Sequence, residues 1–305
     1  MRVQPSIAGI TVAVIVALGC FSQTDRCCAA DPPSAIQWAT GLAPAAGLAF
    51  DENGTAFICN YRRSGTIGRI LSDGTAAIWC DLDEESPGKT KTLPTSVAID
   101  SEGRLVVADS ANGRLLRIDG EKRIAVIAAR FEGLAFEQVF AVTLREPAGD
   151  APGAEIVFAA TLKKTGEDFE AFLFVLDLKT SVLRKLDFNL SLPVSTAITP
   201  DGKWLVVIES PQNRVWKYSL MEAEQADEPA FERLAELGGH ANALKLPLGV
   251  CPSNQIGSVF VVAGHRQEVL EIHLKSGQTL RTFPLSAQHG VACALRGQEL
   301  FVVIR

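Results

Sequence analysis

The stretch LPTSVAIDSEGRLVVADSANGRLLRID, residues 93–119, decides the fold of this chain. It contains an alternating apolar segment, a polar turn that ends at Gly103, a valine-rich segment that ends at Asp109, and a third apolar segment. Alternation of apolar and polar residues on both sides of a glycine turn is typical of an antiparallel β-hairpin. The stretch therefore predicts three consecutive strands of one antiparallel sheet.

The same pattern recurs along the chain from residue 46 onward. The turn glycines of the clear copies are separated by 49, 99, 55 and 40 residues, and they are Gly54, Gly103, Gly202, Gly257 and Gly297. The spacing of 99 is about twice 49, so we expect one further copy between residues 133 and 162, with its turn lengthened around Gly149 and Gly153. Six units of roughly 40–50 residues with four short strands each predict an all-β fold, a six-bladed β-propeller.

The two ends of the chain are expected to meet in the last blade. Outer strands are predicted at residues 124–128, 182–186, 231–237 and 279–283, while the chain ends just after the second strand of the sixth unit. The lone apolar segment at residues 35–40 is therefore predicted to supply the outer strand of the last blade and to close the ring. That blade would then be one strand short, because it is three-stranded or because the gene product is truncated.

Residues 1–30 differ from the rest and are interpreted as a signal peptide, which leaves 31–305 as the propeller domain. Arg2 precedes a twelve-residue apolar run at 7–18, shorter than the ~20 residues needed to span a bilayer. Cleavage after Ala30 is expected, although an earlier cut, a lipid anchor at Cys20 and an uncleaved anchor are alternatives. The predicted location is outside the cytoplasm, in the periplasm or the extracellular space.

Charge and cysteine content restrict the partners. The formal net charge is −6, and no run of Lys and Arg exceeds two residues, so nucleic acid is an unsuitable partner. Four cysteines follow the predicted signal peptide, and their spacing matches no zinc motif. Export would permit disulfides among them in one of three pairings, and the alternative is that all four are buried as small apolar residues.

Residues 93–119 and 192–220 resemble the repeat unit of the senescence-marker-protein/gluconolactonase-like family, with NHL-repeat propellers as near relatives. The resemblance extends over residues 46–305 and implies a six-bladed propeller. It also implies a divalent metal, usually calcium, at the top of the central channel, and a lactonase-type hydrolase activity. The metal ligands that it implies are a Glu that opens the first unit and Asn or Asp residues that open later units.

Six residues are expected at those opening positions, and they are Ala46, Thr95, Glu132, Val194, Leu248 and His289. Alanine, valine and leucine cannot coordinate a hard cation, which needs several oxygen ligands. We therefore expect a degenerate metal site without a resident cation, in which Glu132, Asp109 and Glu209 are only weak candidate ligands.

The hairpin geometry selects candidate ligand-binding residues at the channel mouth. The start of the first strand and the end of the second lie at the same end of a hairpin, so polar residues there should face one rim. These candidates are Asn60, Arg62, Asp109, Glu132, Glu209, His265 and His289. Carboxylates gathered there would shift each other's pKa and could support general-acid chemistry, or they could simply meet water and neighbouring cations.

Three functions are compatible with these features. The first is an exported module that binds a small molecule or a protein through its loop face, with little or no catalysis. The second is a divalent-metal-dependent lactonase with a rebuilt channel site that uses Glu132, Asp109, Glu209 and His289. The third is a propeller that serves only as an interaction platform.

Overall fold

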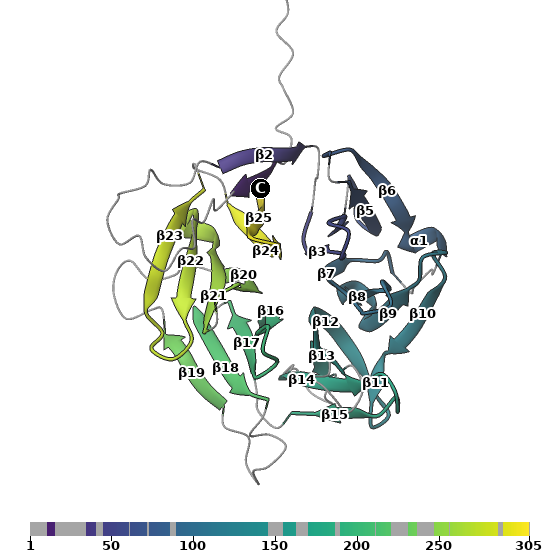
Figure 1. The fold of residues 1–305 in the computed structure, drawn as a ribbon. Coiled ribbons are helices and arrows are strands. Elements are labelled where there is room, and N and C mark those ends of the chain that lie inside the picture. Colours follow the sequence, from purple (N-terminus) through teal and green to yellow (C-terminus); the bar gives the residue numbers. More distant parts are fainter. Residues whose placement is uncertain are drawn as a thin grey trace, which may run out of the picture.

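The fold is taken from a computed structural model of the chain. It describes residues 11–15, 35–40, 45–60, 62–71, 73–85, 90–145, 155–162, 170–186, 190–210, 212–220, 231–236, 247–255, 257–285 and 289–304. These residues form six sheets arranged as the blades of a ring around a central axis (Figure 1). The predicted all-β, six-bladed propeller is thus confirmed.

Blades one to three follow the chain in order. Blade one contains β3 (Leu48–Phe50), β4 (Ala56–Cys59), β5 (Thr66–Ile70) and β6 (Ala76–Asp81), followed by the short helix α1 (Leu82–Glu85). Blade two contains β7 (Pro94–Ile99), β8 (Leu105–Asp109), β9 (Arg114–Ile118) and β10 (Ile124–Ala128), with the 3-10 helix η1 (Ser110–Asn112) after β8. Blade three contains β11 (Arg130–Phe131), β12 (Leu134–Arg145), β13 (Glu155–Leu162), β14 (Glu170–Asp177) and β15 (Leu183–Lys185).

Blades four and five repeat the arrangement. Blade four contains β16 (Pro193–Ile198), β17 (Trp204–Glu209), β18 (Arg214–Ser219) and β19 (Phe231–Glu236). Blade five contains β20 (Pro247–Pro252), β21 (Ser258–Ala263), β22 (Glu268–His273) and β23 (Thr279–Pro284), with η3 (Gly264–Arg266) after β21. The further copy of the repeat that was expected between residues 133 and 162 is the long β12–β13 hairpin, which belongs to blade three.

Blade six joins the two ends of the chain. Its strand order is β2 (Ala35–Thr40), β1 (Thr11–Ile15), β25 (Glu299–Ile304) and β24 (Gly290–Arg296), from the outside inward. The prediction that residues 35–40 form the outer strand of the last blade is confirmed. The expectation that this blade is one strand short is wrong. It has four strands, because Thr11–Ile15 pairs antiparallel with β25 on one side and with β2 on the other.

The core consists of six apolar clusters, one between each pair of neighbouring blades. Strand β8 shows how one strand contributes side chains to two of these clusters. Leu105 and Val107 pack toward blade one, whereas Val106 and Ala108 pack toward blade three. Side chains alternate between the two faces of a strand, so a blade's second strand must be apolar at every position. This requirement explains the continuous valine-rich segments in the sequence.

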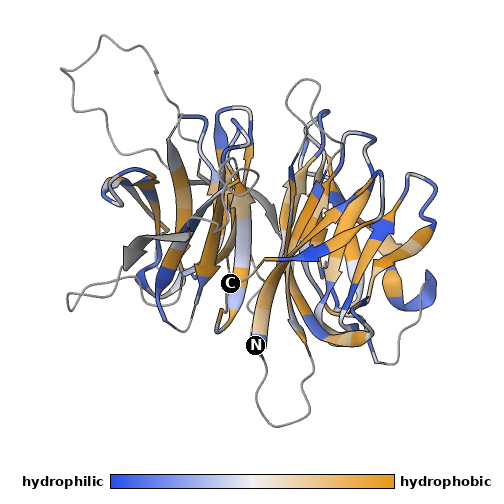
Figure 2. Cartoon of the chain, turned by 90° about the horizontal axis from the view of Figure 1, so that it is seen from below, coloured by the Kyte–Doolittle hydropathy of each residue, from blue (hydrophilic) through white to orange (hydrophobic). Residues whose placement is uncertain are grey.

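Apolar residues fill the strands, and hydrophilic residues gather in the turns at both ends of the ring (Figure 2). Within the described ranges, no helix is both long enough and apolar enough to cross a membrane. The assignment of residues 1–30 as a signal peptide stays a prediction.

Candidate functional site in the central channel

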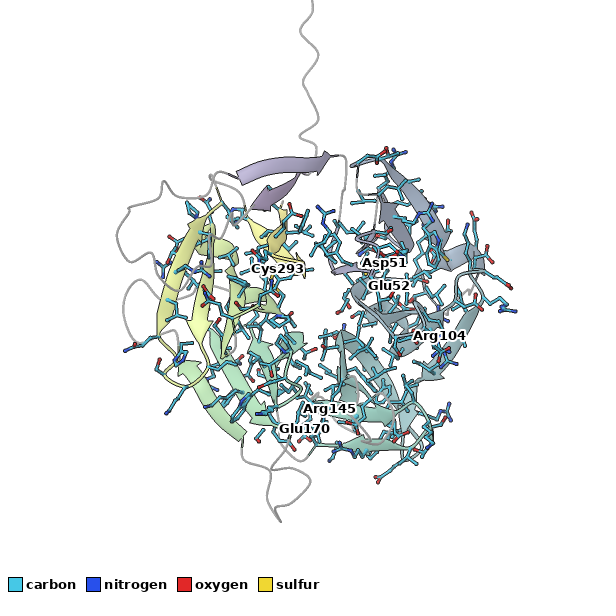
Figure 3. The ribbon with its side chains drawn as sticks, in the orientation of Figure 1. Asp51, Glu52, Arg104, Arg145, Glu170 and Cys293 are labelled. Carbon is cyan, nitrogen blue, oxygen red and sulfur yellow. The ribbon has the colours of Figure 1, made fainter. Side chains whose placement is uncertain are left out.

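A cavity of about 290 Å³ lies where the innermost strands surround the channel. Every blade contributes to its wall, and the lining residues are Ala46, Gly47, Leu48, Thr95, Ser96, Val97, Val142, Val194, Ser195, Thr196, Leu248, Val250, Val291, Ala292 and Cys293. Figure 3 labels one of them, Cys293, on β24 at the inner edge of the ring. As far as the described residues go, the wall consists of aliphatic side chains, hydroxyls and one thiol, without a carboxylate, amine or imidazole.

Each innermost strand enters the channel wall through a β-bulge. In blade two the pairing shifts between Pro94 and Ser96, so that Thr95 is the extra residue. The same shift makes Val194 the extra residue of blade four and Leu248 that of blade five. A bulge leaves one residue out of the ladder and redirects its side chain. Thr95, Val194 and Leu248 all line the cavity, so in these blades the bulge residue faces the bore.

The register identifies the bulge residue in the other three blades. Phe140 lies between the paired residues Val139 and Ala141 in blade three, and Val291 is skipped in blade six. In blade one, the Ala46 N–H donates to Cys59 O at 3.1 Å, while the Cys59 N–H donates to the carbonyl of the next residue, Gly47, at 3.0 Å. All six bulge residues are half-buried. None of them is a carboxylate or an amide.

This register differs from the sequence prediction at two positions. Glu132 and His289 were expected to open units three and six, where the pairing instead places Phe140 and Val291. In blade three, the 12-residue strand β12 begins well outside the channel, and a second register shift between Phe136 and Gln138 moves the alignment further. The remaining four expectations, Ala46, Thr95, Val194 and Leu248, do lie in the channel wall.

The residue after each bulge is small, because neighbouring innermost strands touch there. These residues are Gly47, Ser96, Ala141, Ser195, Gly249 and Ala292. A Cβ added to Gly47 would lie 2.8 Å from Ser96 Cα, and one added to Gly249 would lie 2.9 Å from Ala292 Cα. Contacts this short do not occur for real Cβ atoms, so glycine is required for the close approach.

Where the small residue is serine, its hydroxyl joins two blades. The Val142 N–H donates to Ser96 Oγ at 3.2 Å across the interface of blades two and three. The Val250 N–H donates to Ser195 Oγ at 3.1 Å across the interface of blades four and five. The Thr95 hydroxyl donates to Phe140 O at 2.8 Å. Sequence analysis missed these hydroxyls, although the recurring Gly, Ser or Ala at one position of each unit would have revealed them.

Asp109 lies at the end of β8 and is completely buried. Its Oδ1 accepts the Leu93 N–H at 3.0 Å, and its Oδ2 accepts Arg114 Nε at 2.7 Å and Asn112 Nδ2 at 3.0 Å. Buried carboxylates need such partners because desolvation of an unpaired charge is costly. Asp109 therefore holds the entry and exit loops of its own blade together, and it is not part of the cavity wall.

Glu209 and Asn60 hold equivalent positions in blades four and one. Glu209 accepts the Ser191 N–H at 2.5 Å and the Trp216 indole N–H at 3.0 Å, and it is 3% exposed. Asn60 donates through Nδ2 to Pro94 O at 2.7 Å and so joins blade one to blade two. Neither side chain lines the cavity.

Glu132 lies at the outer edge of blade three, away from the channel wall. It is exposed, with a backbone φ of 49°, in the turn between β11 and β12. With Arg130, Arg184 and Lys185 it lines an open groove of about 650 Å³. The sequence prediction grouped Glu132 with Asp109 and Glu209, and the fold does not bring these three carboxylates together in one cavity.

The other three candidates lie in loops. Arg62 is exposed, with a φ of 63°, in the turn between β4 and β5. His289 precedes β24, and its Nδ1 lies 2.9 Å from Gly264 O in η3. His265 lies within η3, and its side chain is outside the described residues.

These side chains do not fit a resident calcium ion in the channel. Calcium takes six to eight oxygen ligands at about 2.3–2.6 Å, with several carboxylates among them. In the parts of the chain that the structure describes, no three His, Cys, Asp or Glu side chains lie together as a metal-binding group. The channel wall offers hydroxyls and backbone carbonyls at most.

The ring of six four- or five-stranded sheets around a lined bore defines the class of protein, a six-bladed β-propeller. The family model described as SMP-30/Gluconolactonase/LRE-like region matches residues 149–303, just over half of the chain, and an NHL repeat matches residues 92–118. The chain belongs to the SMP-30/gluconolactonase/LRE-like family. No curated protein sequence matches the chain.

Several solved structures share the fold at low sequence identity. A gluconolactonase from Xanthomonas campestris has a TM-score of 0.64 at 17% identity, and 86% of each chain is covered. A luciferin-regenerating enzyme has a TM-score of 0.62 at 16% identity, with 85% of this chain and 82% of that chain covered. A calcium-binding regucalcin from Agrobacterium tumefaciens has a TM-score of 0.60 at 16% identity, with 85% of this chain and 81% of that chain covered.

Proposed function

We propose that this chain is an exported, metal-independent member of its family that binds a small neutral molecule in the central channel. The observation that carries the proposal is the chemistry of the channel wall, which includes the bulge residues Ala46, Thr95, Val194, Leu248 and Val291, and Val142 of blade three. Such a wall favours a ligand with an apolar body and a few hydrogen-bonding groups. Export through a signal peptide cleaved after Ala30, or lipidation at Cys20, belongs to the same proposal. Either event removes β1, so blade six of the mature chain would keep only β2, β25 and β24.

One hydroxyl in the wall is available to a ligand. Thr196 Oγ1 is buried and, among the described residues, has no hydrogen-bond partner. An unsatisfied buried hydroxyl costs about 1–3 kcal/mol, which a ligand or a bound water would recover. The cavity volume of about 290 Å³ is at the lower end of ligand pockets, so the ligand is small.

The binding experiment uses the purified full chain and a panel of neutral lactones and polyols, measured by thermal shift and calorimetry. We expect saturable binding that EDTA does not change and that Thr196→Val weakens about tenfold, since one hydrogen bond is worth about 1.4 kcal/mol here. Val194→Phe, which enlarges a bulge residue in the bore, should abolish binding. Val126→Phe is the matched control, because Val126 is 51% exposed on the outer strand β10.

The alternative is a divalent-metal-dependent lactonase, which membership of the family favours. One bound calcium ion per chain, or gluconolactone hydrolysis that EDTA abolishes, would overturn the metal-independent proposal in favour of the lactonase. If none of the small molecules shows saturable binding, and if the Val194→Phe variant is unaltered in every assay, a protein-interaction platform would be favoured instead.

A further inference from the structure

Two cysteines face each other across the interface of blades five and six. Cys251 lies on β20, and Cys293 lies on β24. The two strands approach each other closely here, as shown by the distance of 2.9 Å between a Cβ added to Gly249 and Ala292 Cα. Both cysteines are buried, at 4% and 7% exposure, in the same apolar cluster.

The alternation of side chains along β24 turns Cys293 toward its partner. Ala292 and Ala294 pack in the cluster shared with blade one, whereas Cys293, between them, packs in the cluster shared with blade five. Cys251 packs in that same cluster from the other side, and the neighbouring Cys293 side chain helps burial to raise the pKa of its thiol. Two thiols in contact across a blade interface are an arrangement from which a disulfide can form.

The other two cysteines of the propeller cannot form such a pair. Cys59 on β4 and Cys80 on β6 are both partners of Ile67 on β5, the strand between them. Two strands separated by a third lie about 9.6 Å apart, beyond the ~7 Å limit for the Cα atoms of a disulfide. Both belong to the cluster between blades one and two, remote from the Cys251 cluster. None of the three ways to pair the four cysteines can therefore give two disulfides.

We propose that Cys251 and Cys293 form a disulfide that links blade five to blade six when the folding chain meets a small-molecule disulfide. In this exchange both thiol S–H bonds break and one S–S bond forms between Cys251 and Cys293. The S–S bond of the oxidant breaks, and its two sulfurs take up the two protons and the two electrons as free thiols. The proposal is independent of what the channel binds.

The position of Cys293 sets the order of events. Where the blades have already assembled, Cys293 lines the channel cavity, so the oxidant reaches its sulfur first and forms a mixed disulfide. Cys251 then attacks that mixed disulfide and releases the second thiol. Burial raises the pKa of the Cys251 thiol well above its ordinary value, so little thiolate is present in the folded protein. Oxidation should therefore be fast during refolding and slow once the ring has closed.

Peptide mapping tests the bond directly. The full chain is refolded with oxidised glutathione, unfolded, alkylated and digested with trypsin, which places Cys251 in the peptide of residues 246–266 and Cys293 in that of residues 282–296. We expect one disulfide-linked species that contains both peptides and that a reductant splits. Recovery of both peptides in alkylated form, or linkage of either one to another cysteine, would overturn the proposal.

A stability measurement supplies the second readout. The bond closes a loop of about 40 residues, so oxidation should raise Tm by about 5 °C, and Cys251→Ala should abolish this rise. Cys59→Ala is the matched control, a buried cysteine in another cluster, and it should keep the full rise. If Cys251→Ala does not fold, the peptide map of the unaltered chain still decides the question.

Discussion

Removal of residues 1–30 is expected to destabilise the propeller, because it removes β1 from the middle of blade six. Four residues of β1 pair with β25 and five pair with β2, so the truncated chain loses both ladders. With about one hydrogen bond per residue pair, each worth about 1 kcal/mol net, loss of the β25 ladder alone costs about 4 kcal/mol. For a protein of this size that corresponds to a decrease in Tm of about 7 °C.

The assay compares the full chain with the truncated chain by calorimetry and by amide hydrogen exchange. In the truncated chain we expect a lower Tm and faster exchange across β25, Glu299–Ile304, because loss of β1 exposes the outer edge of this strand. A chain that lacks only residues 2–10 is the control and should match the full chain. Equal Tm and equal exchange in the truncated chain would refute the reasoning, and they would mean that β2 moves inward to pair with β25.

Further predictions concern the blade interfaces and the buried groups. Gly249→Ala should destabilise the fold by about 1–3 kcal/mol in urea unfolding, because the added Cβ meets the neighbouring strand, whereas Gly120→Ala, with open space around it, should be neutral within about 0.5 kcal/mol. Asp109→Ala should cost about 3–5 kcal/mol, since it removes the buried carboxylate that pairs with the Arg114 guanidinium, and a loss below 1 kcal/mol would contradict its structural role. Burial raises the pKa of Cys59 to about 12 and that of Cys80 to about 11, so both thiols stay protonated at pH 8 and should resist iodoacetamide in the native protein but not in urea.

The architecture follows from features of the sequence that act locally. Turn glycines at regular spacing and strands with apolar residues at every position can only be accommodated by sheets packed on both faces, which is why six blades could be predicted. The outer strand β10 matches its predicted bounds of 124–128, because alternation and flanking turns mark both of its ends. The role of residues 35–40 follows from the need to close the ring.

The third strand of blade six was not predictable from the same signals. A short apolar run after a charged start is the pattern of a targeting segment, and the same apolar residues also suit a strand between two others. Nothing local distinguishes the two uses of Thr11–Ile15. The choice depends on partners almost 300 residues away in β25.

The candidate site shows a similar limit. Asp109 and Glu209 are polar residues at strand ends, which suggested ligand binding, but their oxygens accept backbone and side-chain N–H groups of their own blades. Glu132 was misplaced because β12 extends for 12 residues and contains two register shifts. A register shift of one residue changes which side chain faces the channel, and sequence spacing alone does not reveal it.

The alternation of a bulge residue and a small residue on every innermost strand divides two tasks between adjacent positions. Substitution at the small residue, such as Gly249, pushes two backbones apart and thereby alters the diameter of the whole ring. Substitution at the preceding bulge residue, such as Leu248, changes only what a visiting molecule touches. Single substitutions at the bulge positions that line the cavity can therefore change which ligand the channel accepts, while its width stays fixed.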